Sequence, residues 1–328
     1  MYYRIRHLTR FQYNAPVSES LMEIRMHPRT ESYQRCLDYQ LVITPKAHVH
    51  DYRDFLGNSI HHFGIPSAHR QLQITAESVV EMKDFVDLPH FLAPDAWAEL
   101  DTLIENGDYI GDLLASHFCK PTPLLVDLGV EFGLARRDDP LMLVRELTER
   151  LSRAIEYEPL ATHVDSPIDD ALRLRKGVCQ DYAHILISML RQVRIPARYV
   201  SGYLRHRATD HDRSSDGATH AWIEAFLPSL GWVGFDPTNN IVAGQRHIRT
   251  AIGRDYADVP PTRGVFKGEA STKLSVAVAV SACEELPPEL AELVLERDET
   301  LEREFAAATA AMVAREQFEQ MQQQQQQQ

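Results

Sequence analysis

Three residues whose types can cooperate in nucleophilic catalysis follow one another along the chain: Cys179, His220 and Asp236. A cysteine attacks as the thiolate, and a free thiol with a pKa of about 8.5 is only slightly ionised at neutral pH. A helix amino terminus and a neighbouring imidazolium both lower that pKa. A carboxylate that accepts the imidazole N–H fixes its tautomer and favours the protonated ring. This order is therefore typical of a nucleophile, a base and an orienting group.

The sequence around Cys179 predicts the helix start that such a thiol needs. After Gly177, apolar residues recur at helical spacing over 183–190, which predicts a buried helix with Cys179 in its first turn. Asp181 follows in the same turn and is expected to interact with the free N–H groups there. The backbone N–H of Cys179, at the start of this helix, is the expected first donor to an oxyanion.

Two predicted strands carry the base and the carboxylate. Residues 218–226 alternate in type, which predicts a half-buried strand with His220 on one face. Residues 230–236 predict the next strand, and the turn residues over 228–231 lie between the two. If the strands pair as a hairpin, the carboxylate of Asp236 lies beside His220.

Each of these residues also has a structural interpretation. A lone cysteine at a helix start is often a small buried hydrophobic residue, a strand histidine can simply be hydrogen-bonded, and an aspartate before Pro237 can cap a turn. Asp181 could take part in the reaction instead of only stabilising the helix. Trp222, Trp232 and Asp181 are candidates to line a substrate cleft, although the two tryptophans could equally pack in the core. The ordered cysteine, histidine and aspartate favour the catalytic interpretation.

Four ordered blocks around these residues resemble the transglutaminase-like family of cysteine enzymes. The blocks are Gly-Val-Cys-Gln-Asp-Tyr-Ala-His (177–184), Ile-Pro-Ala-Arg-Tyr-Val-Ser-Gly-Tyr (195–203), His-Ala-Trp-Ile-Glu (220–224) and Phe-Asp-Pro-Thr-Asn (235–239). Other segments are similar to the N-terminal β domain of the bacterial members, and these cover 3–17, 26–29 and 54–58. Together the resemblances span roughly residues 1–85 and 140–245.

The resemblance implies that Cys179, His220 and Asp236 are the catalytic residues. It also implies an α+β fold, in which a small antiparallel N-terminal β domain precedes a papain-like, transglutaminase-like core of helices packed on an antiparallel sheet. Bacterial members with this β domain often act with ATP-grasp-type ligases in peptide modification, so such a ligase is an expected partner. No cofactor is expected, and no calcium-binding loop of EF-hand type is visible.

Changes of hydrophobic pattern divide the chain into four parts. Residues 1–82 are expected to form a β-sandwich or barrel-like domain, with strands over 2–13, 36–44, 48–54, 59–64 and 72–80. Residues 83–138 are expected to be a packed helical connector, with short helices over 95–102 and 109–118.

The catalytic core is expected over 139–283. Asp139 and Pro140 predict a helix that runs to about Tyr157. Further elements predicted in the core are a short helix over 168–175, a strand over 197–205 and a late strand over 273–281.

Residues 284–328 form an acidic tail. They hold eleven acidic and three basic residues, which is a net charge of −8 out of the chain's −13. Apolar residues from Leu290 to Phe305 predict a helix over 289–320, and the glutamines over 322–328 predict a disordered end.

Composition excludes several classes of protein. The apolar fraction of 44% and the charged fraction of 25% are those of ordinary globular proteins. The opening residues resemble no signal peptide, and the most apolar run, 274–283, is too short to span a bilayer. Four scattered cysteines without a CxxC pair favour a reducing cytoplasm. Without a basic stripe or an HExxH motif, neither a nucleic-acid partner nor a metal is expected.

The expected chemistry is the cleavage of an amide bond in a peptide or protein through a thioester on Cys179. Attack by water would make the chain a peptidase, isopeptidase or amidase, whereas attack by an amine would make it a transglutaminase. Efficient transamidation requires a site that binds the amine and excludes water, and the motifs contain no sign of one, so hydrolysis is the favoured prediction. A catalytically idle peptide-binding or scaffold module is the second alternative.

Overall fold

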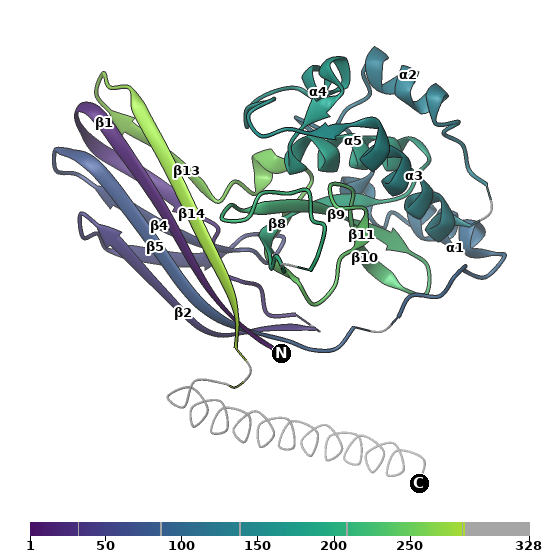
Figure 1. Ribbon diagram of the computed structural model, residues 1–328, viewed down its shortest axis with the longest axis horizontal. Coiled ribbons are helices and arrows are strands. Elements are labelled where there is room, and N and C mark those ends of the chain that lie inside the picture. Colours follow the sequence, from purple (N-terminus) through teal and green to yellow (C-terminus); the bar gives the residue numbers. More distant parts are fainter. Residues whose placement is uncertain (32, 86, 138, 208, 284, 286–328) are drawn as a thin grey trace, which may run out of the picture. The chain divides into compact units, whose positions relative to one another are not determined.

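Two antiparallel sheets organise the computed structural model (Figure 1). It describes residues 1–31, 33–85, 87–137, 139–207, 209–283 and 285. The larger sheet is built around the N-terminal strand, and helices cover the smaller one. This arrangement confirms the predicted α+β fold class. The predicted helix over 289–320 and the glutamine run over 322–328 lie outside the described residues.

The five strands predicted near the amino terminus form one sheet of order β2-β5-β1-β4-β3. They are β1 (Tyr2–Ile24), β2 (Gln34–Thr44), β3 (Val49–Arg53), β4 (Ser59–Ile65) and β5 (His69–Met82). The first half of β1 pairs with β5 and its last residues pair with β4, with a register shift between Gln12 and Val17. β1 is longer than expected because the irregular stretch accommodates Pro16, whose ring lacks an N–H.

Two strands from the far end of the chain complete this sheet, which corrects the division made from the sequence. β13 (Thr262–Lys267) pairs with β1 at residues 18–24, and β14 (Thr272–Cys283) also pairs with β1. The late strand predicted over 273–281 therefore exists, but it lies in the N-terminal sheet and not in the core assigned to 139–283. Alternation predicts a strand without specifying its partner, and the long β1 offers a free edge to both strands.

The smaller sheet has the order β11-β10-β9-β8-β12. Its strands are β8 (Ala197–Leu204), β9 (His220–Leu227), β10 (Gly231–Asp236), β11 (Ile241–Val242) and β12 (His247–Gly253). Ala221, Ile223 and Ala225 of β9 pack in the main hydrophobic core together with the helices. The opposite face of β9 is buried too, so the strand predicted to be half-buried is covered on both sides.

The helices are α1 (Ala96–Glu105), α2 (Pro123–Glu131), α3 (Pro140–Ala154), α4 (Ile168–Leu174) and α5 (Cys179–Gln192), with one-turn helices η1 (Ile110–Asp112) and η2 (Tyr256–Asp258). Asp139 caps α3 as predicted, because its side chain accepts from the N–H of Met142. The prediction of a helix over 109–118 is wrong, because the described chain forms only the single turn η1 there. α2 was not predicted, although Thr122 and Pro123 are an ordinary helix start.

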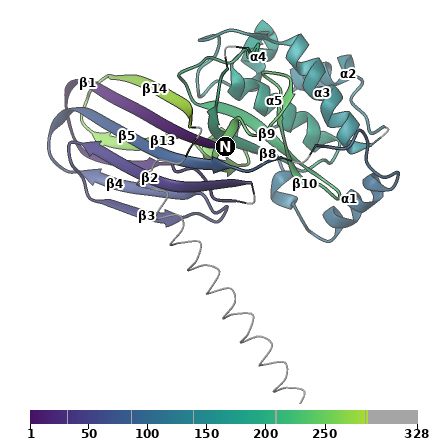
Figure 2. The ribbon, with the colours of Figure 1, turned by 60° about the horizontal axis from the view of Figure 1, so that its bottom comes forward.

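The N-terminal sheet lies beside the helix-covered core (Figure 2). Side-chain amides join the two sheets at β12. Gln34 donates to the carbonyl of Arg249 at 2.9 Å and accepts from its N–H at 2.8 Å. Asn58 makes the same pair of bonds with Ile252, at 2.8 and 2.9 Å. Two amides thus replace a neighbouring strand along the outer edge of β12, and the N-terminal sheet is fixed against the core.

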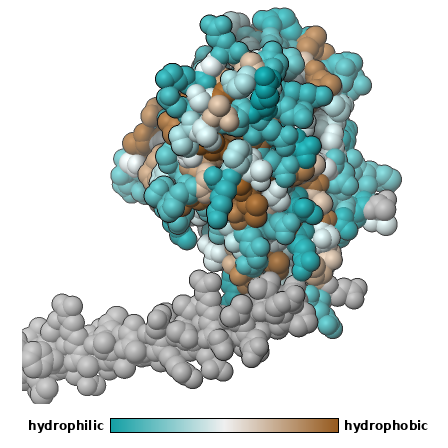
Figure 3. All heavy atoms as spheres, turned by 90° about the vertical axis from the view of Figure 1, so that its left-hand side faces the viewer, coloured by the Kyte–Doolittle hydropathy of each residue, from teal (hydrophilic) through white to brown (hydrophobic). Residues whose placement is uncertain are grey.

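The surface seen from the side of the first sheet is mostly hydrophilic, with scattered apolar groups (Figure 3). No helix among the described residues combines the length and the apolar character needed to cross a membrane.

Candidate active site

Cys179 is the first residue of α5, as the sequence predicts. Asp181 holds this helix start in place: its Oδ2 accepts from the N–H of Val178 at 2.8 Å and from the hydroxyl of Thr162 at 2.5 Å. A Cβ on Gly177 would come within 2.8 Å of the same oxygen, so a glycine is needed there. Asp181 is buried in the first turn of α5 and does not line the cavity at Cys179. It therefore stabilises the helix and is not a cleft residue.

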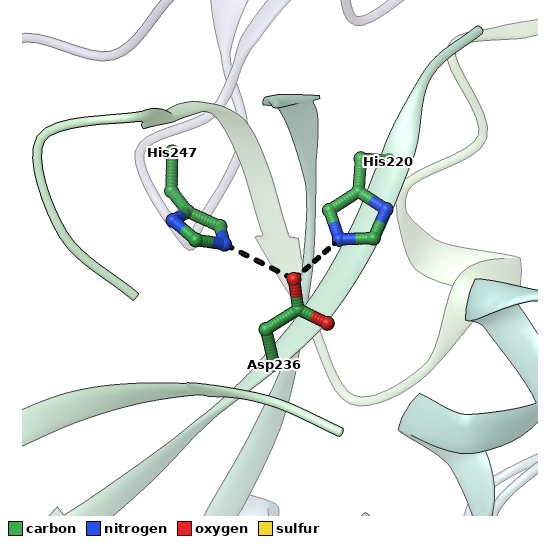
Figure 4. A group of neighbouring side chains, drawn as sticks. All are labelled: His220, Asp236 and His247. Atoms are coloured by element: carbon green, nitrogen blue, oxygen red, sulfur yellow. Dashed lines mark hydrogen bonds and ion pairs between the residues drawn. The ribbon is translucent and has the colours of Figure 1, made fainter. Parts of the chain in front are cut away.

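His220 and Asp236 meet across the β9–β10 hairpin, in which Ile223 pairs with Phe235. Nε2 of His220 lies 2.8 Å from Oδ2 of Asp236 (Figure 4). The other ring nitrogen, Nδ1, is buried, points away from Asp236 and makes no hydrogen bond of ordinary geometry to a described residue. Burial lowers the pKa of His220, but the charge and hydrogen bond of Asp236, followed by the Cys179 thiol, raise it to about 10. The ring is therefore protonated at neutral pH.

Both carboxylate oxygens of Asp236 accept several hydrogen bonds. Its Oδ2 also receives the Asn239 side chain at 2.8 Å and His247 Nε2 at 3.2 Å, and its Oδ1 receives the N–H groups of Thr238 and Asn239. Burial raises the pKa of this carboxyl, but His220 and then His247 outweigh the effect and hold the pKa well below its usual value. Asp236 is thus a fixed negative charge and not only a turn residue.

His247, the first residue of β12, is a member of the site that the sequence did not suggest. Its Nδ1 accepts from the N–H of Gly244 at 3.2 Å, so the ring proton is on Nε2 and is donated to Asp236. Burial lowers the pKa of His247, which keeps this ring neutral beside the protonated His220. No signal in the sequence marked it, because it lies eleven residues beyond Asp236 and outside the resembling blocks.

The ligand atoms of His220, Asp236 and His247 lie within 4.8 Å of one another, a spacing that could also hold a metal ion. Their hydrogen bonds fit this role poorly. Both imidazoles direct an N–H at the same carboxylate oxygen, and a metal would need those nitrogens deprotonated. We therefore interpret the three side chains as a hydrogen-bond network.

The two tryptophans expected at the cleft lie elsewhere. Trp222 stacks on His220 with ring centroids 6.0 Å apart and is 1% exposed, so it supports the imidazole from behind. A Cβ on Gly202 would come within 2.7 Å of its ring. Trp232 packs under Arg198, whose guanidinium lies 3.9 Å from the ring centroid, and it lines a different cavity. Neither side chain lines the cavity at Cys179.

That cavity has a volume of about 240 Å³ and is walled by both sheets. The core contributes Val164, Val178, Cys179, Gln180, Tyr199, Ser201, Thr219, His220, Ala221 and Tyr256, and the larger sheet and its approach contribute His7, Thr9, Pro261, Thr262, Leu274 and Val276. The N-terminal sheet is therefore one wall of the candidate active site. The N–H of Cys179 makes no hydrogen bond to a described residue, so it remains available to an oxyanion.

Two family models match the chain. One, the bacterial transglutaminase-like N-terminal region, matches residues 3–81, and the other, the transglutaminase-like superfamily, matches residues 132–237. The second match includes Cys179, His220 and Asp236 and stops before His247.

One relative matches most of the chain and another matches part of it. An uncharacterized protein of Mycobacterium leprae is 32% identical over 279 residues, which are 85% of this chain and 98% of that protein. A protein-glutamine gamma-glutamyltransferase of Pseudomonas aeruginosa is 33% identical over 140 residues, which are 39% of this chain and 21% of that enzyme.

A solved structure shares the fold. It comes from Cytophaga hutchinsonii and is described as a candidate cysteine protease, with a TM-score of 0.63, 22% identity, and coverage of 88% of this chain and 93% of that one. Its fold and the two family models agree with the sheets and helices described above. The chain therefore belongs to the transglutaminase-like superfamily, in the bacterial branch that carries the transglutaminase-like N-terminal region.

Proposed function

We propose that this protein hydrolyses amide bonds in peptides or isopeptides through a thioester on Cys179. The observation that carries the proposal is His220, which is held by Asp236 at one nitrogen while its other nitrogen is buried, free and close to the thiol. Nδ1 of His220 makes no hydrogen bond of ordinary geometry to the Cys179 thiol. Such a bond in an enzyme is often long without substrate and shortens when substrate binds. Membership of the superfamily independently supports cysteine-dependent enzyme chemistry.

The reaction divides into two steps. In the first, the Cys179 thiolate forms a bond to the carbonyl carbon, and the imidazolium of His220 gives its proton to the departing amine as the C–N bond breaks. In the second, water adds to the thioester while His220 takes a proton from it, and the carboxylic acid leaves as Cys179 regains its starting state. Asp236 keeps its negative charge throughout and orients the ring.

The oxyanion formed in each step needs two fixed donors. We assign the first to the N–H of Cys179 and the second to the hydroxyl of Tyr199. Tyr199 lines the cavity, is 2% exposed, and its hydroxyl makes no hydrogen bond to a described residue. Burial, and to a smaller extent the neighbouring Cys179, raise the pKa of Tyr199 well above its usual value, so the hydroxyl keeps its proton.

Water is favoured over an amine as the second nucleophile because no aspartate or glutamate is among the described residues that line the cavity. A lysine side chain or another ammonium acceptor would have to shed its proton and its hydration there without a neighbouring carboxylate. Transamidation is the second candidate, and the similarity to the Pseudomonas aeruginosa gamma-glutamyltransferase favours it. A catalytically idle scaffold is disfavoured, since it would have no use for an imidazole nitrogen left free beside a thiol.

The test is product analysis with and without an acceptor. The protein and its Cys179→Ala variant are incubated with a peptide library, alone and with a primary amine such as putrescine, and products are identified by mass spectrometry. We expect Cys179-dependent release of free acid, with amidated product a small fraction at millimolar amine. Mainly amidated product would instead establish transamidation, and equal turnover by Cys179→Ala would refute the mechanism.

A cytoplasmic location is also part of the proposal. It is supported by the four cysteines, all of which are free thiols among the described residues. An ATP-grasp-type ligase remains a proposed partner on the family resemblance alone.

A further inference from the structure

β14 presents a free edge beside Cys179. Asn14 of β1 donates to the carbonyl of Ser271, just before β14, and the Ser281 hydroxyl donates to the carbonyl of Arg4. The two strands therefore run antiparallel, and Ser271 faces β1. In an antiparallel strand, successive residues direct their N–H and C=O groups to opposite edges. Odd-numbered residues of β14 thus face β1, and even-numbered ones face outward.

Near the middle of β14, the outward edge is bonded to a loop of the core. The N–H of Val278 donates to the carbonyl of Gly217 at 2.9 Å, in the loop that leads into His220. This bond confirms that even-numbered residues face outward, and it anchors β14 next to the catalytic strand. The same alternation directs the backbone groups of Leu274 and Val276 to this edge, where β14 pairs with no second described strand and no loop or turn of the described chain bonds to these two residues. An unpaired strand edge therefore runs along the cavity.

The side chains of the same two residues line the cavity wall. Leu274 is 53% and Val276 is 44% exposed, and across the cavity Val164 is 61% exposed. His7 also lines the wall, but its two nitrogens are hydrogen-bonded to Tyr203 and Thr9 and burial lowers its pKa to about 4, so the ring is neutral. Apart from Cys179 and His220, the described lining therefore carries no charged side chain, and its wall on β14 is apolar.

We propose that the acyl substrate is an extended peptide that adds as a strand to the edge of β14 at Leu274 and Val276, with an apolar side chain against these two residues. This inference rests on the proposed function, because it uses Cys179 to define where the reacting carbonyl lies. Strand addition supplies affinity through main-chain hydrogen bonds and specificity through alternate side chains. Leu274 and Val276 are then the specificity-determining residues, and the N-terminal sheet becomes the substrate platform.

The first experiment measures binding without chemistry. The Cys179→Ala variant is titrated with fluorescent acetylated pentapeptides rich in leucine, each N-methylated at one position. We expect affinity to fall about three- to tenfold at every second position and to stay unchanged at the others, because a lost hydrogen bond has about this effect. A flat N-methyl profile would overturn the inference, whether or not the wild-type protein proves to be a hydrolase.

A backbone variant tests the protein side of the same bonds. Val276→Pro removes an N–H that the alternation directs outward, away from β1, and proline is tolerated on strand edges whose N–H faces solvent. We expect peptide affinity about three- to tenfold weaker with an unchanged melting temperature. Unchanged affinity in this folded variant would contradict strand addition at β14.

The side-chain prediction uses a matched pair. Leu274→Glu places a carboxylate in the cavity, whereas Val265→Glu places one on β13 at a residue that is 66% exposed and outside the cavity. We expect Leu274→Glu to lower the affinity for leucine-rich peptides about tenfold or more and to raise the affinity for lysine-containing peptides above that of the parent. Val265→Glu should change neither affinity. Equal behaviour of the two variants would overturn the assignment of Leu274.

Discussion

Strand β9 carries two buried charged side chains on one face, four residues apart, and their surroundings differ. At His220, Asp236 binds one ring nitrogen and the other is left free beside a cavity. At Glu224, both carboxylate oxygens are paired, one with Arg198 at 2.7 Å and the other with Arg249 at 2.6 Å. No residue of that second cluster lines the cavity at Cys179.

The difference separates the catalytic role proposed for His220 from the structural role of Glu224. A buried charge costs several kcal/mol of desolvation unless it is paired, and both clusters meet this condition. Only the first leaves a titratable atom in contact with space that a substrate can enter. Burial and charge alone would therefore mark Glu224 as readily as His220, and the free nitrogen beside a cavity is what distinguishes them.

The largest effect is expected on kcat, when the carboxylate that holds His220 is removed. Asp236→Asn removes the charge that holds His220 protonated and can present the wrong tautomer, so kcat should fall on the order of 10²–10⁴-fold. KM should change little, because Asp236 does not line the cavity. Steady-state kinetics on the peptide substrate measures both values. A loss below about fivefold would show that another group orients the imidazole.

Removing the charge of Glu224 should instead lower the free energy of unfolding and leave kcat nearly unchanged. Glu224→Gln removes the carboxylate partner of Arg198 and leaves Arg249 paired with Glu31 alone, so the free energy of unfolding should fall by about 3 kcal/mol, the low end for breaking a buried ion pair. The folded fraction should keep a kcat within about threefold of the parent. Urea denaturation measures the free energy of unfolding, and titration of the active site by alkylation gives the number of folded sites needed to calculate kcat. A large loss of kcat per folded molecule would mean that the two clusters are coupled.

The pH dependence of stability sharpens the contrast. His220 has a folded pKa of about 10 against an ordinary value of 6.5, so its stabilisation is complete below about 6.5 and is lost as pH rises through about 10. Asp236 has a depressed pKa, so its contribution is lost as pH falls below its usual range. Stability should therefore decline from pH 6.5 to 10 in the parent and less in Asp236→Asn. Parallel denaturation curves for the two proteins would contradict this assignment.

The smallest effect is expected at His247, which touches Asp236 but not the cavity. We expect His247→Gln to lower kcat about three- to tenfold, because a glutamine N–H can still donate to the carboxylate. His247→Ala should lower kcat more and shift the pH–rate profile, since the charge on Asp236 is then less well held. Equal kcat values and profiles in the two variants would show that His247 only fills space.

Much of the fold follows from local pattern. The five N-terminal strands, the capped helix α3 and the hairpin of β9 and β10 form close to the predicted residues, because alternation, helical spacing and caps act between near neighbours. The same reasoning misplaced the helix over 109–118 and missed α2, where prolines and short apolar runs give a weak signal. It also overlooked β12, whose residues are buried throughout and so do not alternate.

The sequence by itself determined the candidate catalytic residues and their immediate supports: the cysteine at a helix start, the histidine and aspartate on paired strands, and the Asp181 cap. Tertiary structure alone decided what surrounds them. Leu274 and Val276 reach the site from the far end of the chain because β14 pairs with β1. His247 joins Asp236 only because β12 lies beside β8. Local periodicity fixes the type of an element, but contacts between distant segments depend on which strand edges and faces remain free once the chain has folded.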